Sequence, residues 1–343
     1  MKAVGFKKYG GVEVIEQLDV GTPQLGENDV LIHTSYTSIN RLDILVRSGY
    51  HGLKLPMPHI PGSDVVGRIE AIGSSVQGFS EGELVVANTV FGCGRCAKCA
   101  AGDEVSCREW KVHGMHTDGS YAQLVRVPAS TLVRPPKELS EEDLACIPIS
   151  LSISWRSIVT LGKGKEGQTI VIRGASGNVG IFATMIAKAL GMRVIAISRN
   201  EEKRARLKQL GADAFVDGSL GKEETAKQIM DLTEGTGADL TIDPFGATLG
   251  ESILFTGHGG KVAVFGTVRG TESTVSIPGT YLKNITVFGT HNENKAQFEE
   301  ALRFIAQKKI KPIIATRLPL ERAAEGQDML EKSEPFGKIL LKT

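Results

Sequence analysis

The chain has 343 residues, of which 41% are hydrophobic and 23% are charged, and this length is sufficient for two globular domains. The formal net charge is +1, which argues against a surface that binds nucleic acid or an acidic membrane. No apolar run reaches the roughly 18 residues of a membrane-spanning helix, and the amino-terminal sequence lacks the apolar core of a signal peptide. We therefore expect a cytoplasmic protein whose cysteines are reduced.

The amino-terminal part of the chain, to about residue 145, is predicted to be rich in β-structure. The start, MKAVGFKKYGGVEV, is typical of a β-hairpin, and DVLIHTSYTSI, VVGRIEAIG and AQLVRVP are β-branched and partly alternating. Glycine, proline, serine and aspartate separate these stretches, as expected for turns.

Beyond SWRSIV the chain changes to an alternation of strands and helices. QTIVIRG, RVIAIS, ADLTIDPFG, KVAVFG and NITVFG predict strands, and NVGIFATMIAKALG and NEEKRARLKQLG predict helices. This alternation indicates an α/β fold with a doubly wound parallel sheet. After about residue 290, NKAQFEEALRFIAQKK predicts a helix and GKILLK a strand, and we expect this segment to return to the first domain.

A glycine-rich loop lies between the strand TIVIRG and the helix that follows it. Gly174, Gly177 and Gly180 are spaced GxxGxxG, and the strand RVIAIS follows at the distance that a βαβ unit requires. Glycines at these positions allow the backbone to approach a pyrophosphate bound at the helix N-terminus. The alternative is a tight turn that binds nothing. The context favours a dinucleotide site.

The end of the next strand predicts which dinucleotide binds. NAD sites usually carry an acidic residue there, whereas this chain has Ser198 and Arg199, with Lys203 one helical turn further on. A hydroxyl and two cations suit the 2′-phosphate of NADPH. Glu201 and Glu202 lie close by, and the alternative is that these charges form a solvated helix start. We predict NADPH.

Four of the five cysteines lie between residues 92 and 107. Cys93, Cys96, Cys99 and Cys107 have the spacing C-x2-C-x2-C-x7-C, which suits a closed tetrahedral zinc site. Such a site braces a loop and leaves no position for a substrate. A disulfide framework is the alternative, which the reducing compartment disfavours. The fifth cysteine, Cys146, lies in the apolar stretch LACIPI and is predicted to be buried.

The chain resembles the medium-chain dehydrogenase/reductase superfamily nearly end to end. The resemblance is carried by PGSDVVGRIEAIGSSVQGF, the cysteine lobe, DGSYAQLVRVP, GASGNVG and EPFGKILL. It implies a GroES-like catalytic domain over residues 1–148 with a zinc lobe at 92–107, a Rossmann NADP-binding domain over 149–288, and a return to the catalytic domain over 289–343. Cofactor contacts are predicted at Gly174, Ser176, Gly177, Asn178, Val179, Gly180, Ser198, Arg199 and Lys203, and the resemblance adds Gly266, Thr267, Thr290, His291 and Lys338.

The positions that match the family's catalytic zinc ligands carry other residues here. Asn40, Ser63 and Ile149 replace the three ligands, and Leu42 replaces the hydroxyl that relays the alcohol proton. None of the three is a good zinc ligand, and Asp64, even with Asp43, makes a poor site. We therefore expect a structural zinc and no catalytic zinc.

The stretch from Asn40 onwards instead resembles the zinc-free quinone oxidoreductases. Asn40, Asp43, Arg47, Gly49 and Tyr50 match the pattern N-x-x-D-x-x-x-R-x-G-x-Y, except that Tyr50 directly follows Gly49. The chain thus combines the cysteine lobe of one branch with the active site of the other.

Without a Lewis acid, the expected reaction is hydride transfer to an acceptor that carries its own electron sink. We predict reduction of a quinone, enone or cyclic ketone by NADPH, with Asn40 and Tyr50 as catalytic hydrogen-bond donors and with Leu42, Ser63 and Ile149 lining the pocket. Tyr50 could equally be a packing aromatic. The histidines in the same region, any of which is a possible proton donor, are His51, His59, His113 and His116.

The strand NITVFG matches the family's last Rossmann strand, whose open edge predicts a homodimer or homotetramer. Two alternative functions stay open. One is a zinc-type alcohol dehydrogenase or ketone reductase with atypical ligands, and the other is a protein that binds NADPH without turnover.

Overall fold

The computed structural model describes residues 1–343, except for the side chain of His51. The chain forms two compact units. Unit 1 comprises residues 1–149 and 292–343, and unit 2 comprises residues 150–291. None of the helices described has the length and apolar character required to cross a bilayer.

Unit 1 is built mainly from antiparallel strands. Its largest sheet has the order β10-β6-β5-β3-β9, a smaller one has the order β17-β18-β4, and β1 pairs with β2 and β7 with β8. The strands are β1 (Lys2–Gly5), β2 (Glu16–Asp19), β3 (Asp29–His33), β4 (Tyr36–Ser38), β5 (Val66–Ile72), β6 (Leu84–Ala87), β7 (Val90–Phe91), β8 (Lys111–Val112), β9 (Leu124–Pro128), β10 (Leu132–Val133), β17 (Ile314–Pro319) and β18 (Lys338–Lys342).

The helices of unit 1 are mostly short. They are α1 (Arg41–Arg47), α2 (Ala97–Ala100), α3 (Glu141–Ala145), α10 (Lys295–Gln307) and α11 (Ala323–Glu331), with 3-10 turns η1 (Val12–Val14), η2 (Tyr50–Gly52), η3 (Glu104–Ser106), η4 (Ala129–Thr131) and η6 (Leu320–Arg322). The longest, α10, buries Phe298, Ala301, Leu302 and Ile305, whose i, i+3, i+4, i+7 spacing gives it one apolar face.

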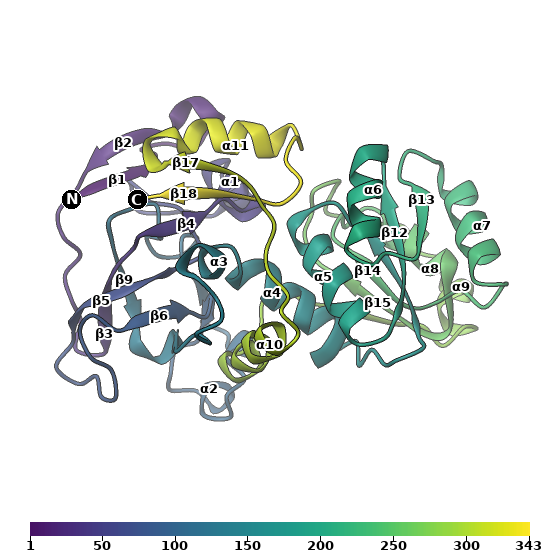
Figure 1. Cartoon of the computed structure of the whole chain (residues 1–343), viewed down its shortest axis with the longest axis horizontal. Coiled ribbons are helices and arrows are strands. Elements are labelled where there is room, and N and C mark those ends of the chain that lie inside the picture. Colours follow the sequence, from purple (N-terminus) through teal and green to yellow (C-terminus); the bar gives the residue numbers. More distant parts are fainter. The chain divides into compact units, whose positions relative to one another are not determined.

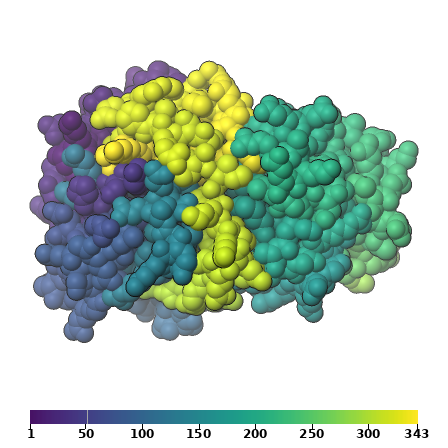
Figure 2. All heavy atoms as spheres, viewed as in Figure 1, coloured from purple at the N-terminus to yellow at the C-terminus, as the bar shows by residue number. Residues whose placement is uncertain are grey.

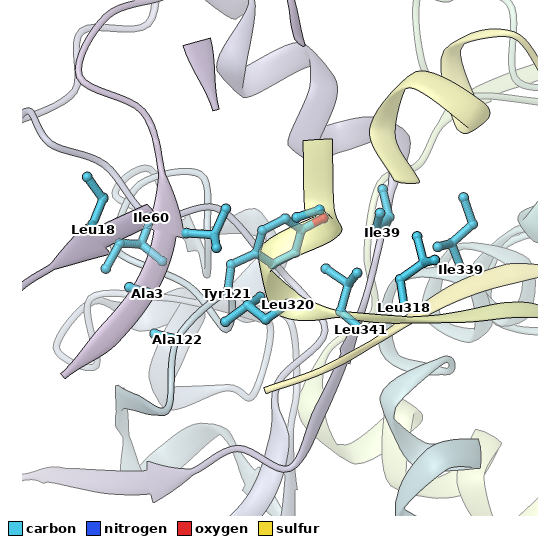
Figure 3. Close-up of a cluster of buried hydrophobic side chains, with 12 residues drawn as sticks. Ala3, Leu18, Ile39, Ile60, Tyr121, Ala122, Leu318, Leu320, Ile339 and Leu341 are labelled. Atoms are coloured by element: carbon cyan, nitrogen blue, oxygen red, sulfur yellow. The ribbon is translucent and has the colours of Figure 1, made fainter. Parts of the chain in front are cut away.

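Both ends of the chain contribute to the core of unit 1. Strand β18, coloured yellow in Figure 1, pairs antiparallel with the purple β4, so that Leu341 lies opposite Thr37. Figure 3 shows Ala3 and Ile60 in one buried cluster with Leu318 and Leu341. The yellow carboxyl-terminal residues also lie against purple amino-terminal residues on the surface of this unit (Figure 2).

Unit 2 is a doubly wound α/β unit. Its six strands are parallel and have the order β13-β12-β11-β14-β15-β16. They are β11 (Thr169–Arg173), β12 (Arg193–Ser198), β13 (Ala214–Asp217), β14 (Ala238–Asp243), β15 (Thr256–Val264) and β16 (Thr286–Gly289). The helices are α5 (Asn178–Ala189), α6 (Glu201–Gln209), α7 (Lys222–Leu232), α8 (Leu249–Phe255) and α9 (Ile277–Tyr281), preceded by α4 (Pro148–Trp155) and the π-helical turn η5 (Arg156–Thr160) at the crossover.

The predicted α/β class is confirmed, and two local expectations need correction. The hairpin partner of β1 is β2, which lies beyond the quoted stretch, because η1 occupies residues 12–14. DVLIHTSYTSI forms two strands, β3 and β4, which belong to different sheets. Strands β13 and β17 and helices α7, α8 and α11 were not predicted; β13 has only four residues, of which only Val216 is buried.

Candidate functional site

The residues predicted to bind the cofactor gather at the carboxyl ends of the strands of unit 2. The order of the strands reverses between β11 and β14, which is where dinucleotides bind in sheets of this kind. The residues at this edge are Gly174, Ser176, Gly177, Asn178, Val179 and Gly180 after β11, Ser198, Arg199 and Lys203 after β12, Gly266 and Thr267 after β15, and Thr290 and His291 after β16.

The glycine loop has the backbone geometry that a pyrophosphate requires. Gly174 has a φ of 60°, a conformation that favours glycine. A Cβ on Gly180 would lie 2.6 Å from the Cα of Ala175, so only glycine lets α5 pack this closely against the loop. Gly177 is the N-cap of α5 and supplies no side chain to the first N–H groups of the helix. These N–H groups fit an anion.

The end of β12 fits a phosphorylated ribose. Ser198 is buried, and its Oγ donates a hydrogen bond to Ser176 Oγ (3.3 Å) in the glycine loop. Arg204, which the sequence analysis missed, donates from Nη1 to the carbonyl of Ser198 (3.3 Å). It adds a third cation beside Arg199 and Lys203, and its only signal in the sequence was its place one residue after Lys203 in the first turns of α6.

One carboxylate lies close to this group of cations. Asp217 pairs with Ser198 in the register of β12 and β13. Its carboxylate accepts hydrogen bonds from the N–H and hydroxyl of Ser219 and lies 3.6 Å from Arg204, and these bonds lower its pKa. Asp217 is therefore already bonded within its own turn.

The four clustered cysteines of unit 1 converge. Their Sγ atoms lie within 4.8 Å of one another, and Cys96 and Cys107 are 3.8 Å apart, close to the separation of two ligands in a tetrahedral zinc site with bonds of about 2.3 Å. The backbone N–H groups of Cys93 and Glu109 donate to Cys107 Sγ at 3.4 and 3.3 Å. Hydrogen bonds from Cys99 lower the pKa of Cys96 to about 7, while burial raises the pKa of Cys99 to about 12. These residues fit a structural zinc.

A second polar group in unit 1, which we call the Asp64 cluster, comprises Ser38, Asn40, Asp64 and Lys338. Asp64 Oδ2 accepts hydrogen bonds from Lys338 Nζ (2.8 Å), Asn40 Nδ2 (2.8 Å) and Ser38 Oγ (2.6 Å). Lys338 Nζ also donates to Asn40 Oδ1 (2.6 Å) and Ser38 Oγ (3.0 Å). The side chains of Lys338 and Asp64 are 2% and 0% exposed.

Two residues predicted from the sequence, Asn40 and Ile149, form hydrogen bonds within the Asp64 cluster. The backbone N–H of Ile149 donates to Asp64 Oδ1 (2.9 Å), and the side chain of Asn40 is bonded at both its oxygen and its nitrogen. Three hydrogen bonds use all three N–H groups of Lys338. The predicted cofactor contact of Lys338 is untested; the structure assigns its ammonium to these three partners within unit 1.

Asp43 caps the helix that Asn40 begins. The N–H of Asn40 donates to Asp43 Oδ2 (2.8 Å), as does the hydroxyl of Tyr121 (3.1 Å). Asp43 is fully buried, and this burial, with a smaller contribution from the nearby Asp64, raises its pKa to about 7. Asn40 and Asp43 therefore form a capping box at the start of α1.

Arg47 joins α1 to α11. Its Nη1 donates to Gln327 Oε1 (2.8 Å) and its Nη2 to Glu331 Oε1 (2.6 Å). Leu42 and Tyr50 pack against an apolar cluster that includes Phe6. This packing supports the reading of Tyr50 as a packing aromatic, and its catalytic role stays a prediction.

Three side chains of unit 1 that are 0% exposed have no hydrogen-bond partner for any of their polar atoms within the described structure. These are Ser63, Thr89 and His113, which we call the Thr89 cluster, and each is 0% exposed. Burial lowers the pKa of His113 to about 3, so its ring is neutral at pH 7. An unpaired buried polar group costs about 1–3 kcal/mol, so these groups lower the stability of the folded chain. Ser63 was a predicted pocket residue, whereas nothing marks Thr89 in the sequence, because threonine is common in strands.

The other histidines of this region have local partners. His59 Nε2 contacts the carbonyl of Gly114 (3.1 Å), and His116 Nδ1 accepts from the N–H of Val112 (3.1 Å). The side chain of His51 lies outside the described residues.

Comparisons with known proteins agree with this architecture. Residues 26–137 match the alcohol dehydrogenase GroES-like domain, and residues 178–307 match the zinc-binding dehydrogenase domain. The acryloyl-coenzyme A reductase of Sulfurisphaera tokodaii (strain DSM 16993 / JCM 10545 / NBRC 100140 / 7) is 32% identical over 94% of this chain and 95% of its own. The acryloyl-coenzyme A reductase of Metallosphaera sedula (strain ATCC 51363 / DSM 5348 / JCM 9185 / NBRC 15509 / TH2) is 31% identical over the full length of both.

The chain belongs to the medium-chain dehydrogenase/reductase superfamily. Among solved structures, a crystal structure of an NAD-dependent alcohol dehydrogenase superposes with a TM-score of 0.92 at 35% identity and covers 100% of both chains. The superfamily predicted from the sequence motifs is thereby confirmed.

The positions of a catalytic zinc in this dehydrogenase/reductase carry a poor donor set. Asn40 Oδ1 is bonded to the Lys338 ammonium, Ser63 offers a neutral hydroxyl, and Ile149 offers no side-chain ligand. The ammonium of Lys338 lies 2.6 Å from Asn40 Oδ1, so a metal ion bound to Asn40 would lie beside a positive charge. These residues do not fit a zinc ion.

Proposed function

We propose that this dehydrogenase/reductase uses NADPH to reduce a carbon–carbon double bond conjugated to a carbonyl group, without a catalytic zinc. The observation that carries the proposal is the Asp64 cluster, in which Lys338 bonds to Asn40, the residue that by resemblance stands at the position of a catalytic zinc ligand. The similarity to two acryloyl-coenzyme A reductases supports an enoyl thioester as the substrate class.

A conjugated acceptor suits a site of this kind. NADPH held at the glycine loop of unit 2 would supply a hydride for the β-carbon of the acceptor. The electron pair of the double bond moves onto the conjugated carbonyl oxygen, and a proton from solvent then completes the α-carbon. Hydrogen-bond donors in a buried site stabilise the charge on that oxygen without a metal. Without a Lewis acid to lower the pKa of its hydroxyl group, a simple alcohol is expected to be oxidised slowly.

The choice of NADPH rests on the group of cations after β12. Arg199, Lys203 and Arg204 follow Ser198, and no carboxylate ends this strand. Arginine binds phosphate through charge-assisted hydrogen bonds, and the carboxylate of Asp217 is already bonded to Ser219. The 2′-phosphate therefore has cationic partners in unit 2.

The remaining parts of the proposal concern structure and assembly. The four cysteines hold one structural zinc per chain. Strand β16 lies at the edge of its sheet, and Ile277, Tyr281 and Leu282 expose 62–65% of their surface close to it in the sequence. We propose that this edge forms the contact of a homodimer or homotetramer.

The test is a comparison of acceptors with NADPH and NADH in protein purified without added metal. We expect crotonyl and acryloyl thioesters and cyclohexenone to be reduced faster than cyclohexanone, and NADPH to be preferred. Elemental analysis of the same sample should give close to one zinc per chain. Two zinc ions per chain with oxidation of simple alcohols would instead support a zinc-type dehydrogenase, and tight NADPH binding with no turnover of any acceptor would support a binding protein.

A further inference from the structure

Thr89 and His113 lie opposite each other on neighbouring strands. Strands β7 and β8 pair with Val90 opposite Val112, and the N–H of His113 donates to the carbonyl of Thr89 (3.2 Å), so the same register continues for one more residue. Side chains of directly opposed residues project from the same face of a sheet. The hydroxyl of Thr89 and the ring of His113 are therefore neighbours.

Ser63 lies beside this pair. A Cβ on Gly114 would lie 2.6 Å from the carbonyl carbon of Gly62, so the residues next to Ser63 and His113 are in backbone contact. Both glycines have positive φ, 107° for Gly62 and 71° for Gly114. The two loops approach each other this closely because neither position carries a side chain. The Thr89 cluster is thus contributed by three separate segments, two of which meet at the backbones of Gly62 and Gly114.

The neighbours of the Thr89 cluster are apolar, so they do not explain why its three side chains are polar. Ala87, two residues before Thr89, belongs to an apolar core cluster with Val65 and Val85. The ring of Phe91 stacks on that of His113 at 4.8 Å between centroids and 27° between planes, which fixes the orientation of the imidazole. Apolar residues at 63, 89 and 113 would pack without the unpaired groups, so these groups point to a ligand.

We propose that Thr89 and His113, with Ser63 beside them, bind the carbonyl oxygen of the conjugated substrate. A neutral imidazole offers one N–H donor and a threonine hydroxyl offers another, which together match the two lone pairs of a carbonyl oxygen. During reduction this oxygen gains negative charge, and donors that are already fixed in place stabilise it. The inference rests on the proposed function and assigns its substrate-binding residues.

The first test compares two buried threonines of unit 1. Thr89→Val removes a hydroxyl that has no partner among the described residues, whereas Thr131→Val removes a hydroxyl that donates to the carbonyl of Pro128 (2.8 Å). We expect Thr89→Val to lower kcat/KM for crotonyl thioester by about 10- to 100-fold while the melting temperature stays the same or rises. Thr131→Val should lower the melting temperature and leave kcat/KM within about 2-fold. Thr89→Ser should restore most of the activity. If Thr89 had a purely structural role, Thr89→Val would not lower kcat/KM while leaving the melting temperature unchanged or higher.

The second test uses a probe that is not turned over. Butyryl-N-acetylcysteamine, a saturated thioester, should bind wild type, and its Kd should rise about 5- to 10-fold in Thr89→Val and in His113→Phe. If both variants keep wild-type kcat/KM and wild-type Kd, the inference is wrong. If wild type reduces no acceptor but binds the probe in a Thr89-dependent way, the site stands and the proposed reaction fails. If wild type neither reduces any acceptor nor binds the probe, both are wrong.

Discussion

Removing the ammonium of Lys338 should destabilise unit 1 strongly. Lys338→Met keeps most of the side-chain volume but leaves the Asp64 carboxylate buried without its counter-charge. Breaking a fully buried ion pair by removing one partner costs about 3–5 kcal/mol, whereas an exposed pair contributes about 0–1 kcal/mol. The side chains of Lys338 and Asp64 are 2% and 0% exposed, so the larger figure applies.

The matched control is the exposed pair of Lys332 and Asp328. Its nitrogen–oxygen distance is 2.5 Å, but its side chains are 59% and 39% exposed, so Lys332→Met should change the free energy of unfolding by less than about 1 kcal/mol. The two substitutions are chemically identical and differ in burial, which separates the loss of a buried pair from the loss of a lysine.

The assay is chemical denaturation followed by the fluorescence of Trp110, in a Trp155→Phe background that leaves one tryptophan, within unit 1. The double variant Lys338→Met/Asp64→Asn should recover about 2–4 kcal/mol relative to the sum of the single changes, because it removes both charges. A loss below about 1 kcal/mol for Lys338→Met, or strict additivity in the cycle, would refute the argument that the two charges stabilise each other.

Four further predictions concern the cofactor, the zinc, the pH dependence and the assembly. Arg199→Glu should raise KM for NADPH about 10-fold or more while KM for NADH changes little, as measured by steady-state kinetics; equal effects on both would contradict binding of the 2′-phosphate. Removal of zinc with a chelator should lower the melting temperature and abolish the zinc signal in elemental analysis, and Cys107→Ser should do the same; an unchanged melting temperature would argue against a structural site. Asp43 has a pKa of about 7 in the folded chain, above its ordinary value, so its contribution to stability is complete below about pH 4 and is lost as pH rises through 7. Denaturation at several pH values should show Asp43→Asn gaining on wild type over this range, by an amount on the order of a few kcal/mol; a pH-independent difference would contradict burial of the carboxyl. Val287→Lys on β16 should convert the assembly to monomers in light scattering, and an unchanged mass would exclude this edge as the interface.

Features that rest on neighbouring residues could be predicted from the sequence. The glycine loop and the four cysteines each lie within about sixteen residues, and local spacing determines which atoms meet. The parallel strands of unit 2 are apolar enough to identify one by one, with the exception of β13.

Contacts between distant segments could not be predicted in the same way. Lys338 and Asp64 lie 274 positions apart, and the pairing of β18 with β4 places Lys338 near Ser38 and Asn40, which also bond to Asp64. Arg47 matched a family motif, but its partner Gln327 lies on a helix that the pattern did not reveal. Thr89 carries no signal in its own segment, because its lack of a partner is a property of the folded surroundings.

The contribution of both chain ends to unit 1 has a consequence for biosynthesis. Residues 150–291 are contiguous, so unit 2 can fold as soon as they leave the ribosome. Unit 1 must wait, because β4 lacks its neighbour and Asp64 lacks its cation until β18 has been translated. A message truncated before codon 338 would therefore yield a chain with a complete dinucleotide fold and an unfinished Asp64 cluster, exposing apolar surface that quality-control proteases recognise.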